Sequence, residues 1–347
     1  MYDAARCLTT ERVAMALTIY REKDANLPVF RNTRVAIIGY GNQGRAHALN
    51  LRDSAVKVSV GQREGRGFER AKGDGFDPSP ISEVVKGADL LIMALPDEVH
   101  ASVYQSDIAP SITPGQALGF VHGFSIRYGL IKPPEDVDVV MVAPKGPGTL
   151  VRSMYLEGKG VPALMAVHRD ATAHAKRIAL AWSVGIGAAR AGVVETTFEC
   201  ETETDLFGEQ VVLCGGVTAL AKAAFETLVE AGYEPEFAYL ECVHELKQTV
   251  DLLYEHGLTG MRDRISNTAE FGDLTRGPRL ISDQTREEMK RILQEIRDGA
   301  FAKEWMTEHD EGGARYHKLH TADVDTPFEK AGRRVRSLMP WLGEQAT

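Results

Sequence analysis

Cysteine is scarce in this chain, whose 347 residues include four cysteines and no pair at CxxC spacing. A disulfide framework is therefore excluded, and we expect reduced thiols in a cytoplasmic protein. Uninterrupted apolar runs are short as well. None approaches the ~18 residues that a membrane span needs, and charged residues interrupt the N-terminal pattern, so neither a membrane anchor nor a secretory signal is expected.

Positive charge is also in deficit, since the formal net charge is −9. This balance argues against a nucleic-acid-binding surface and against a polybasic membrane anchor. The deficit is concentrated between Glu195 and Glu255, a stretch with fourteen acidic residues and two basic ones. Carboxylates at this density repel one another unless a cation binds among them. The stretch is therefore either a cation site or a solvated acidic helix face.

The length of the chain predicts two domains, each with its own core. After a leader, residues 1–30, short apolar runs alternate with helical patterns. This alternation predicts a doubly wound α/β domain of the Rossmann type with a parallel sheet, residues 31–194. From residue 195 to 342, apolar residues recur at three- and four-residue spacing, which predicts an all-helical domain. The expected strands are Val35–Gly39, Val56–Val60, Leu90–Leu95, Ala117–Val121, Val139–Ala143 and Ala163–Val167.

A glycine motif follows the first expected strand and opens a helical stretch, which is the context in which GxGxxG binds a dinucleotide. The first glycine permits the tight turn, the second lets the backbone approach the pyrophosphate, and the third lets helix and strand pack closely. Phosphate oxygens then accept hydrogen bonds from free N–H groups at the helix N-terminus. A purely structural glycine turn is the alternative. The candidate cofactor-binding residues are Gly39, Tyr40, Gly41, Asn42, Gln43 and Gly44.

The loop after the second expected strand holds residues of both charges where the adenosine ribose is expected. An acidic residue there accepts a hydrogen bond from the 2′-hydroxyl, whereas arginines suit a 2′-phosphate. Glu64 therefore favours NADH, and Arg63 with Arg66 favours NADPH. These residues leave the choice between NADH and NADPH open.

Two pairs of carboxylates lie in helical patterns at a spacing of four residues, Asp205 with Glu209 and Glu241 with Glu245. Each pair is expected on one face of its helix. Two such pairs facing each other would supply the oxygen ligands that Mg²⁺ prefers, and helical carboxylates are known to hold two metal ions in this way. Spacing alone leaves a solvated acidic face open, but the residues around Glu209 are too apolar for an ordinary exposed helix.

Two basic residues, His122 and Lys145, each follow an expected strand. Ligands of open α/β sheets bind beyond the carboxyl ends of the strands, where both residues fall. A histidine can transfer protons near neutral pH, and a lysine near carboxylates can position or donate one. Either residue alone is more often structural, but together they are candidate catalytic residues.

With these residues in place, the sequence resembles the ketol-acid reductoisomerases of the shorter class, from about Tyr20 to Leu342. The similar segments are long and specific to that family. They are Val35–Leu51, Leu95–Val99, His122–Phe124, Val142–Gly148, Glu195–Gly216, Phe225–Tyr254 and Ile265–Gly272.

The resemblance implies an active site shared by the two subunits of a homodimer. Asp205, Glu209, Glu241 and Glu245 would hold two Mg²⁺ ions, with Asp205 bridging both, and Ser266 would contact the substrate. Glu241, Glu245 and Ser266 would reach the site from the partner subunit, because the helical domains of the family intertwine and are knotted. Further cofactor contacts are implied for Asp97, Glu98, Val99, His100 and Gly148.

The implied substrates are the acetohydroxy acids 2-acetolactate and 2-aceto-2-hydroxybutyrate. They are converted to 2,3-dihydroxyisovalerate and 2,3-dihydroxy-3-methylvalerate on the route to valine and isoleucine. Mg²⁺ would act as a Lewis acid during alkyl migration, and the nicotinamide would then reduce the rearranged 2-keto acid. His122, Lys145 and Glu245 are the implied catalytic residues, with Glu245 or a water at Lys145 helping to remove the hydroxyl proton.

Three positions depart from the family pattern. Asn42, Arg45 and His100 stand where serine, histidine and glutamine are usual, and the ribose loop lacks the serines that usually bind a 2′-phosphate. These departures bear on the choice between NADH and NADPH and not on the reaction.

Two other functions compete with this interpretation. A metal-independent hydroxy-acid dehydrogenase would share the Rossmann domain, the helical dimerisation domain and a catalytic lysine, but it has no need of two carboxylate pairs. A dinucleotide-binding sensor without catalysis would bind the cofactor and turn nothing over. The presence of His122, Lys145 and the acidic stretch in one chain speaks against the sensor.

Overall fold

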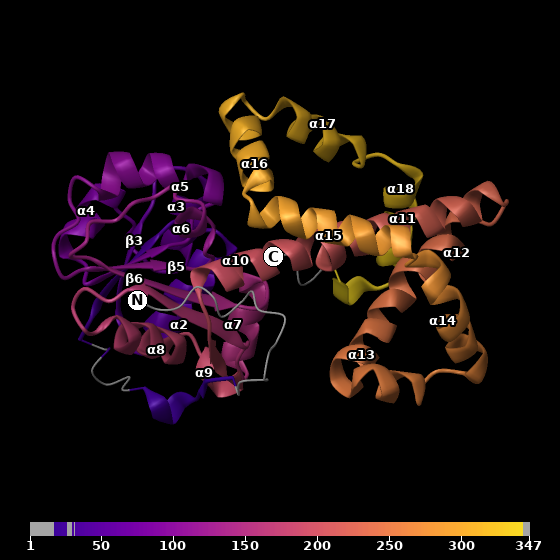
Figure 1. Ribbon diagram of the computed structural model, residues 1–347, viewed down its shortest axis with the longest axis horizontal. Coiled ribbons are helices and arrows are strands. Elements are labelled where there is room, and N and C mark those ends of the chain that lie inside the picture. The colour runs from indigo at the N-terminus through magenta and orange to yellow at the C-terminus, as the bar shows by residue number, and fades with distance from the viewer. Residues whose placement is uncertain (1–16, 26–29, 31, 343–347) are drawn as a thin grey trace. The chain divides into compact units, whose positions relative to one another are not determined.

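The computed structural model describes residues 17–25, 30 and 32–342, which form two compact units (Figure 1). The first unit ends at Thr204 and the second begins at Asp205. The first holds every described strand and the second is helical, which confirms the expected fold class. The division falls within helix α10 (Phe198–Gly208), and the expected boundary at residue 194 lies in strand β8 (Val193–Glu195). Residues 1–16 and 26–29 of the expected leader lie outside the described residues.

One sheet forms the centre of the first unit. Its strands are β1 (Ile19–Tyr20), β2 (Arg34–Ile38), β3 (Lys57–Gly61), β4 (Leu90–Met93), β5 (Ala117–Phe120), β6 (Asp138–Pro144), β7 (Ala163–Arg169) and β8. They are ordered β1-β8-β7-β6-β5-β4-β2-β3, and β2 to β6 pair in parallel. Every residue of β4, β5 and β6 is buried, as expected for parallel strands covered by helices on both faces.

A short bridge extends the parallel part of the sheet beyond β3. The Ser79 N–H donates to the Val60 carbonyl, and the Ser79 carbonyl accepts from the Gln62 N–H. With this bridge counted as a strand, the order Ser79-β3-β2-β4-β5-β6 is the 3-2-1-4-5-6 order of dinucleotide-binding folds. The order reverses between β2 and β4, and such folds bind their ligand in the crevice at this switch point.

Strand β7 departs from the expected parallel pattern, because it pairs antiparallel with β6. Pro144 at the end of β6 lies opposite Ala163 at the start of β7. Helix α7 (Gly148–Leu156) leads the chain away from β6, and residues 157–162 return it to the same end of the sheet. A parallel connection would instead have to cross to the opposite end. Alternating apolar runs in the sequence do not distinguish these two paths.

Helices cover both faces of the sheet (Figure 1). On one face, Trp182 of α8 (Ala175–Gly185) and Leu51 of α2 (Asn42–Asp53) are fully buried in a cluster with Ile37 of β2. On the other face, Val85 of α4 (Ile81–Gly87) and Ile108 are buried with strand residues. Each such side chain contributes roughly 2 kcal/mol of burial free energy. The remaining helices of this unit are α3 (Arg66–Gly73), α5 (Asp97–Val103), α6 (Phe124–Arg127) and α9 (Ala188–Ala191).

The described end of the leader covers one edge of the sheet. Strand β1 pairs antiparallel with β8. The Tyr20 hydroxyl donates to the Glu195 carboxylate at 2.6 Å, and the Lys176 ammonium lies 3.2 Å from the same carboxylate and over the Tyr20 ring. Because β8 is paired on both sides, it offers no open edge to another chain.

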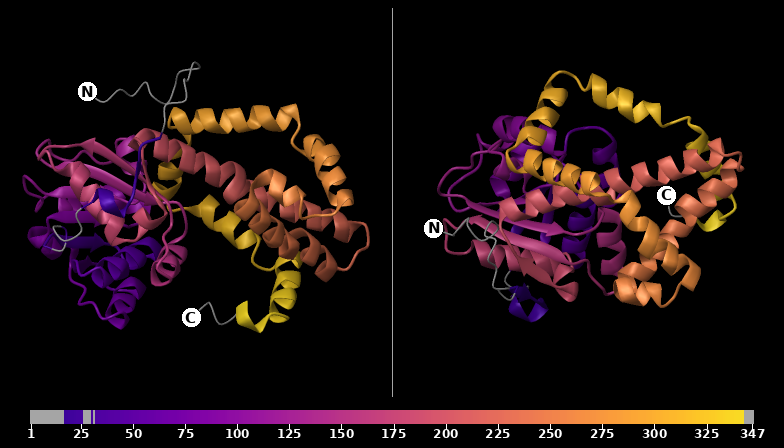
Figure 2. Two further views of the ribbon diagram at one scale, coloured as in Figure 1. Left: turned by 90° about the horizontal axis from the view of Figure 1, so that it is seen from below. Right: turned by 45° about the vertical axis from the view of Figure 1, so that its right-hand side comes forward.

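The second unit consists of helices (Figures 1 and 2). A buried cluster of Phe225, Ala238, Tyr239, Ala331 and Val335 joins three of them, α11, α12 and α18. The continuous helical stretch Phe198–Glu230 is long and apolar enough to cross a membrane by length and composition alone, and 11% of its apolar window is buried. The helices are α11 (Gly215–Glu230), α12 (Pro235–Tyr239), α13 (Glu245–Arg262), α14 (Asn267–Leu280), α15 (Asp283–Arg297), α16 (Ala300–Asp310), α17 (Ala314–Ala322) and α18 (Pro327–Ser337).

Three π-helical turns interrupt the helices of the described chain. They are η3 (Tyr104–Ile108) after α5, η4 (Glu209–Leu213) after α10 and η5 (Leu240–His244) after α12. In η4, for example, the Cys214 N–H donates to the Glu209 carbonyl five residues back. Such turns are rare and occur frequently at functional sites. Both predicted carboxylate pairs meet one, because Glu209 begins η4 and Glu241 lies within η5. The turn η5 lies between Glu241 and Glu245, so a regular α-helical face does not describe that pair, whereas Asp205 and Glu209 are joined by α10.

Candidate functional site

The glycine motif forms the turn between β2 and α2 that the sequence predicts. Gly39 has a φ of +96°, which disfavours any residue with a Cβ. A Cβ at Gly44 would lie 2.2 Å from the Gly39 carbonyl oxygen, and one at Gly148 would lie 2.1 Å from the Asn42 carbonyl oxygen. These close approaches bring the first residues of α2 and α7 together. The free N–H groups at the start of these helices then lie at the switch point between β2 and β4.

Gly41 allows a direct test of dinucleotide binding, because a Cβ there would meet no protein atom within 4 Å. Gly41→Ala is expected to leave the thermal unfolding midpoint unchanged. It should weaken binding of NADH and NADPH about tenfold or more, since the methyl group would stand where the backbone approaches the pyrophosphate. Fluorescence titration measures the binding, and Gly87→Ala, at a second open position, is the matched control. Unchanged affinity in Gly41→Ala would contradict a pyrophosphate at this turn.

A polar network ties the glycine turn to helix α3, which follows the ribose loop. The Tyr40 hydroxyl donates to the Asp74 carboxylate at 2.9 Å, and the Arg45 guanidinium donates to both Asp74 oxygens at 2.7 and 2.9 Å. The hydrogen bonds from Arg45 hold the pKa of the Asp74 carboxyl below its usual value. Arg45, one of the departures from the family pattern, thus anchors the end of α3.

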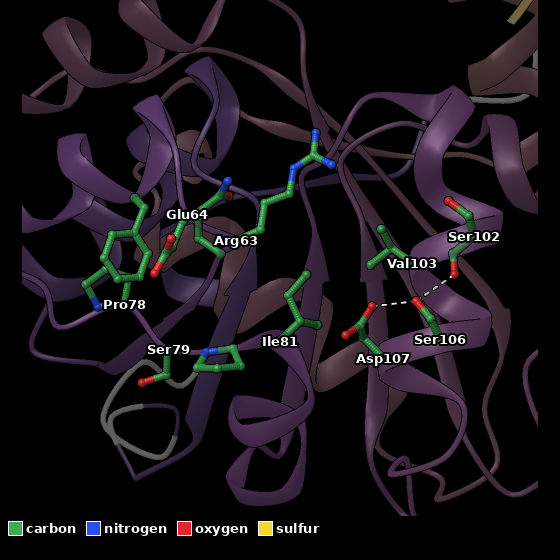
Figure 3. Close-up of a pocket in the computed structure, with 12 residues that line it drawn as sticks. Arg63, Glu64, Pro78, Ser79, Ile81, Ser102, Val103, Ser106 and Asp107 are labelled. Carbon is green, nitrogen blue, oxygen red and sulfur yellow. Dashed lines mark hydrogen bonds between the residues drawn. The ribbon is translucent and has the colours of Figure 1, made fainter.

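The ribose loop lines a pocket of about 520 Å³ (Figure 3). Arg63 and Glu64, both exposed, form part of one side. Arg66 begins α3 and is not among the residues that line the pocket. The volume suits one half of a dinucleotide, and the pocket lies beyond β3 and β4, where the adenosine is expected. The other lining residues are Gln62, Phe68, Pro78, Ser79, Pro80, Ile81, Ser102, Val103, Ser106 and Asp107.

The segment from Asp97 to His100, predicted to bind the cofactor, forms the beginning of α5 after β4. Asp97, Glu98 and Val99 are half-buried, whereas His100 is buried. Its Nε2 lies 2.9 Å from the Leu95 carbonyl oxygen, which can only accept, so Nε2 carries the proton. Its Nδ1 therefore accepts from the Ser125 hydroxyl at 2.8 Å. Both ring nitrogens are thus engaged within the protein.

Two buried histidines, His47 and His100, are expected to make the free energy of unfolding depend on pH. Burial lowers the pKa of His100 to about 4 and that of His47 to about 3. Unfolded histidines have a pKa of about 6.5, so below that pH the unfolded chain binds protons that the folded chain does not. The stabilisation is complete above about pH 6.5 and is lost as the pH falls toward about 4.

For His100 alone, the free energy of unfolding is expected to fall by about 2 kcal/mol between about pH 7 and about pH 5. Urea unfolding at several pH values measures this loss. His100→Gln, which carries the residue usual in the family, should lose that part of the slope and keep the part due to His47. An unchanged slope in His100→Gln would contradict the assignment.

His122 and Lys145 meet at a buried carboxylate, Glu201 of α10. The Lys145 Nζ lies 2.7 Å from Glu201 Oε1, and the His122 Nδ1 lies 3.1 Å from Glu201 Oε2. The Gly123 N–H also donates to Oε2, at 3.0 Å. His122 follows β5 and Lys145 follows β6, so the cluster lies at the carboxyl ends of the strands, as the sequence predicts.

The donors around Glu201 determine its charge. Burial, with 1% of the residue exposed, would raise the pKa of its carboxyl group. The hydrogen bonds and charges of His122 and Lys145 outweigh this effect and hold the pKa below its usual value. An ionised carboxylate only accepts hydrogen bonds, so the His122 Nδ1 carries a proton. When the His122 ring is neutral, its Nε2 is an acceptor.

Helix α10 is fixed against the loop that carries His122. Arg127 donates to the Glu203 carboxylate at 2.8 and 3.1 Å. A Cβ at Gly123 would lie 2.3 Å from the Thr202 hydroxyl oxygen, so glycine allows the loop to approach the helix. Asp205 follows Glu201 by one turn of the same helix. The loop contacts therefore set the position from which the first predicted metal ligand extends.

The remaining predicted ligands lie in the second unit. Glu209 begins η4, Glu241 lies in η5 and Glu245 begins α13, and all three are exposed. Ser266 caps helix α14, where its Oγ accepts from the Ala269 N–H at 3.1 Å. As an acceptor in the cap, the hydroxyl group retains its own proton for donation to a ligand.

Family models match both parts of the chain. The NADPH-binding domain of acetohydroxy acid isomeroreductase matches residues 29–192, and the C-terminal domain of ketol-acid reductoisomerase matches residues 198–341. This chain belongs to the ketol-acid reductoisomerase family. It is an NAD(P)H-dependent oxidoreductase, and the resemblance drawn from the sequence is confirmed.

Solved structures agree with membership of the reductoisomerase family. An NADH-preferring ketol-acid reductoisomerase from an uncultured archaeon is 43% identical, and the match covers 93% of this chain and 99% of that one with a TM-score of 0.91. A semialdehyde dehydrogenase NAD-binding protein from Cupriavidus necator is 17% identical over 77% of this chain and 99% of that one, with a TM-score of 0.58. A putative oxidoreductase from Jannaschia sp. CCS1 is 18% identical over 76% and 97%, with a TM-score of 0.55. These last two share the fold.

Glu201 of this member of the reductoisomerase family was not predicted from the sequence. The available signal was its place four residues before Asp205, within the acidic stretch. Fourteen acidic residues in that stretch made the signal weak, because helical spacing alone does not tell which of them are buried. Burial between two strand ends distinguishes Glu201, and that is a property of the fold.

Proposed function

We propose that this protein catalyses the Mg²⁺-dependent alkyl migration and NAD(P)H-dependent reduction of 2-acetolactate, and of 2-aceto-2-hydroxybutyrate, to the corresponding dihydroxy acids. The observation that carries the proposal is the Lys145–Glu201–His122 cluster at the carboxyl ends of β5 and β6. His122 and Lys145 lie in the part of the chain that matches the family model named for NADPH binding, and Glu201 lies in the part that matches the C-terminal model. Asp205 follows one helical turn after Glu201.

The chemistry of the donor set fits Mg²⁺. Asp205, Glu209, Glu241 and Glu245 offer carboxylate oxygens only, which suit a hard cation, and Glu209 and Glu241 belong to π-helical turns. These four residues would hold the metal, with Glu241, Glu245 and Ser266 coming from a second copy of the chain. When bound, Mg²⁺ supplies Lewis-acid polarisation of the ketol oxygens, and the nicotinamide supplies the hydride.

The residues of the chain itself supply position and proton transfer. Glu201 orients the Lys145 ammonium through a hydrogen bond of 2.7 Å. It orients the His122 ring through a hydrogen bond of 3.3 Å between Nδ1 and Oε1. The Lys145 Nζ can donate to the oxygen that gains charge during the reaction, or to a water beside it. The His122 Nε2 can accept a proton, because its Nδ1 is held by Glu201. Glu245 would assist removal of the hydroxyl proton.

The test is oxidation of NADH and, separately, of NADPH by the purified protein with 2-acetolactate, first with Mg²⁺ and then with excess EDTA. Turnover with Mg²⁺ that disappears with EDTA is the expected result. A dehydrogenase that needs no metal would keep its activity in EDTA, and a sensor would oxidise neither cofactor.

We further propose that NADH is the preferred cofactor. Glu64 lines the pocket, whereas only one of the two arginines that favour NADPH, Arg63, does so, and the 43% identical archaeal relative is described as NADH-preferring. Glu64→Ser is expected to raise the ratio of kcat/KM for NADPH to that for NADH about tenfold, because it removes a negative charge that would repel a 2′-phosphate. Steady-state kinetics with both cofactors measure the ratio. Glu69→Ser, an exposed acid on α3 outside the pocket, is the control, and an unchanged ratio in Glu64→Ser would exclude Glu64 from the choice.

We propose that the protein forms a homodimer, which the surface of the second unit supports. Large apolar side chains are exposed along η4, α11 and α13, among them Leu213, Leu220, Leu253 and Tyr254. Soluble proteins seldom leave so many apolar groups in water, and a second copy of the chain is the occupant that an active site shared between subunits requires. The same second copy would cover the apolar stretch Phe198–Glu230. Analytical ultracentrifugation tests this proposal, and a monomer at micromolar concentration would contradict it.

The cytoplasm is the proposed location. The three cysteines of the described chain, Cys200, Cys214 and Cys242, are free thiols. Free thiols are typical of a reducing compartment, where NADH and NADPH are also available.

A further inference from the structure

The pocket beside the ribose loop has two chemically different sides (Figure 3). Arg63 and Glu64 belong to the ribose loop. Across the pocket from Glu64 stand Ser102, Ser106 and Asp107, which belong to α5 and η3. The polar groups on the second side were not predicted from the sequence, and neither the ribose nor the pyrophosphate site explains them.

Apolar groups between these two sides suit a flat base. Ile81 lies between Glu64 and Asp107 (Figure 3), and Phe68, Pro78, Pro80 and Val103 also line the pocket. An adenine ring buries its faces against such side chains, while its polar edge requires hydrogen-bond partners. A ribose held at Glu64 places the attached base toward the opposite side of the pocket.

Asp107 is the acceptor on that side. Its carboxylate lies 2.5 Å from the Ser106 Oγ, which in turn lies 3.0 Å from the Ser102 carbonyl oxygen. Residues 104–108 form the π-helical turn η3, and Asp107 is half-buried within it. The contact with the Ser106 Oγ limits the freedom of the carboxylate. A carboxylate accepts hydrogen bonds without donating any. The 6-amino group of adenine donates two hydrogens, whereas hypoxanthine and guanine have a carbonyl oxygen at that position.

We propose that Asp107 recognises the 6-amino group of the cofactor's adenine and so makes the pocket selective for adenine against 6-oxopurines. This inference rests on the proposed function in one respect, which is that the adenosine half of the cofactor binds in this pocket. It concerns the base, whereas Glu64 concerns the ribose.

The experiment compares the binding of NADH with that of its hypoxanthine analogue, in which a carbonyl replaces the 6-amino group. Fluorescence titration is carried out without ketol and without Mg²⁺, so the result does not depend on turnover. The unaltered protein is expected to bind NADH about tenfold more tightly or better, the range of one hydrogen bond to a charged group. In Asp107→Asn this ratio should fall to within about threefold, because an amide can either accept from an amino group or donate to a carbonyl.

Glu64→Gln is the matched control, since it alters the ribose side of the same pocket. It should weaken both ligands equally and keep their ratio. Asp107→Ala, which offers no side-chain acceptor, should also lower the ratio, and circular dichroism confirms that each variant is folded. Equal affinity of the unaltered protein for both ligands, or an unchanged ratio in Asp107→Asn, would overturn the proposal. Selective binding of NADH without any turnover of 2-acetolactate would uphold the role of Asp107 and reject the proposed reaction.

Discussion

Glu241→Gln is expected to abolish both the alkyl migration and the reduction of the ketol, while binding of NADH remains unchanged. The amide keeps the size of the side chain but removes the negative charge that makes it a ligand for a hard cation. Catalysis that depends on two bound Mg²⁺ ions should fall by about four orders of magnitude or to background, because the metal site loses one of its negatively charged ligands. Coupled assays of rearrangement and of NADH oxidation measure the two steps separately.

Binding of Mn²⁺, used as a spectroscopic substitute for Mg²⁺, should weaken in Glu241→Gln in parallel with activity. Glu255→Gln, which alters an exposed acid on α13, is the control and should leave both properties unchanged. A Glu241→Gln protein that still rearranges 2-acetolactate would remove Glu241 from the metal site. Loss of NADH binding would instead indicate a general defect of folding.

Glu201→Gln is expected to lower kcat about a hundredfold or more with little change in the KM for NADH. The carboxylate holds Lys145 by an ion pair of 2.7 Å and fixes the proton of His122 on Nδ1. A neutral amide can neither form the ion pair with Lys145 nor fix the proton of His122 in the same way. Both basic side chains therefore lose their orientation and the negative charge beside them. Glu201 is therefore a positioning residue, and its effect should also alter the pH dependence of kcat.

Glu203→Gln separates positioning from stability. Glu203 lies on the same helix, is also buried, and forms its ion pair with Arg127 instead. Its replacement should lower the thermal unfolding midpoint but leave kcat and its pH profile close to those of the unaltered protein. Glu201→Asp should recover part of the activity, since it restores the charge at a slightly different position. Equal pH profiles for Glu201→Gln and the unaltered protein would show that the cluster is structural.

Much of the first unit could be predicted because its signals are local. The run from Arg34 to Gly44 combines a buried strand with a motif in which Gly39 and Gly44 meet each other, so sequence spacing and contact coincide. The same holds for His122 and Lys145, since residues that follow parallel strands necessarily lie at one edge of the sheet. The antiparallel direction of β7 could not be predicted, because it depends on where α7 leads the chain.

The metal ligands illustrate a different limit. A four-residue spacing predicts one helical face only if the helix is regular, and η5 breaks that regularity between Glu241 and Glu245. Asp107 was not predicted either, because it belongs to a π turn and is not part of a sequence motif. Glu201 required knowledge of burial. Sequence patterns thus identified residue types and neighbourhoods, whereas packing and helix irregularities decide which side chains meet.

The π turns have a consequence for how this family can diverge. An i→i+5 bond holds one residue more than the α-helical turn it replaces, so each turn is where a helix can gain or lose a single residue without breaking. A one-residue gap between related chains would normally be sought in a loop. In this chain three such gaps are to be sought inside helices, at Tyr104–Ile108, Glu209–Leu213 and Leu240–His244. An alignment that moves these gaps into neighbouring loops would shift Asp107, Glu209 and Glu241 out of register with their counterparts.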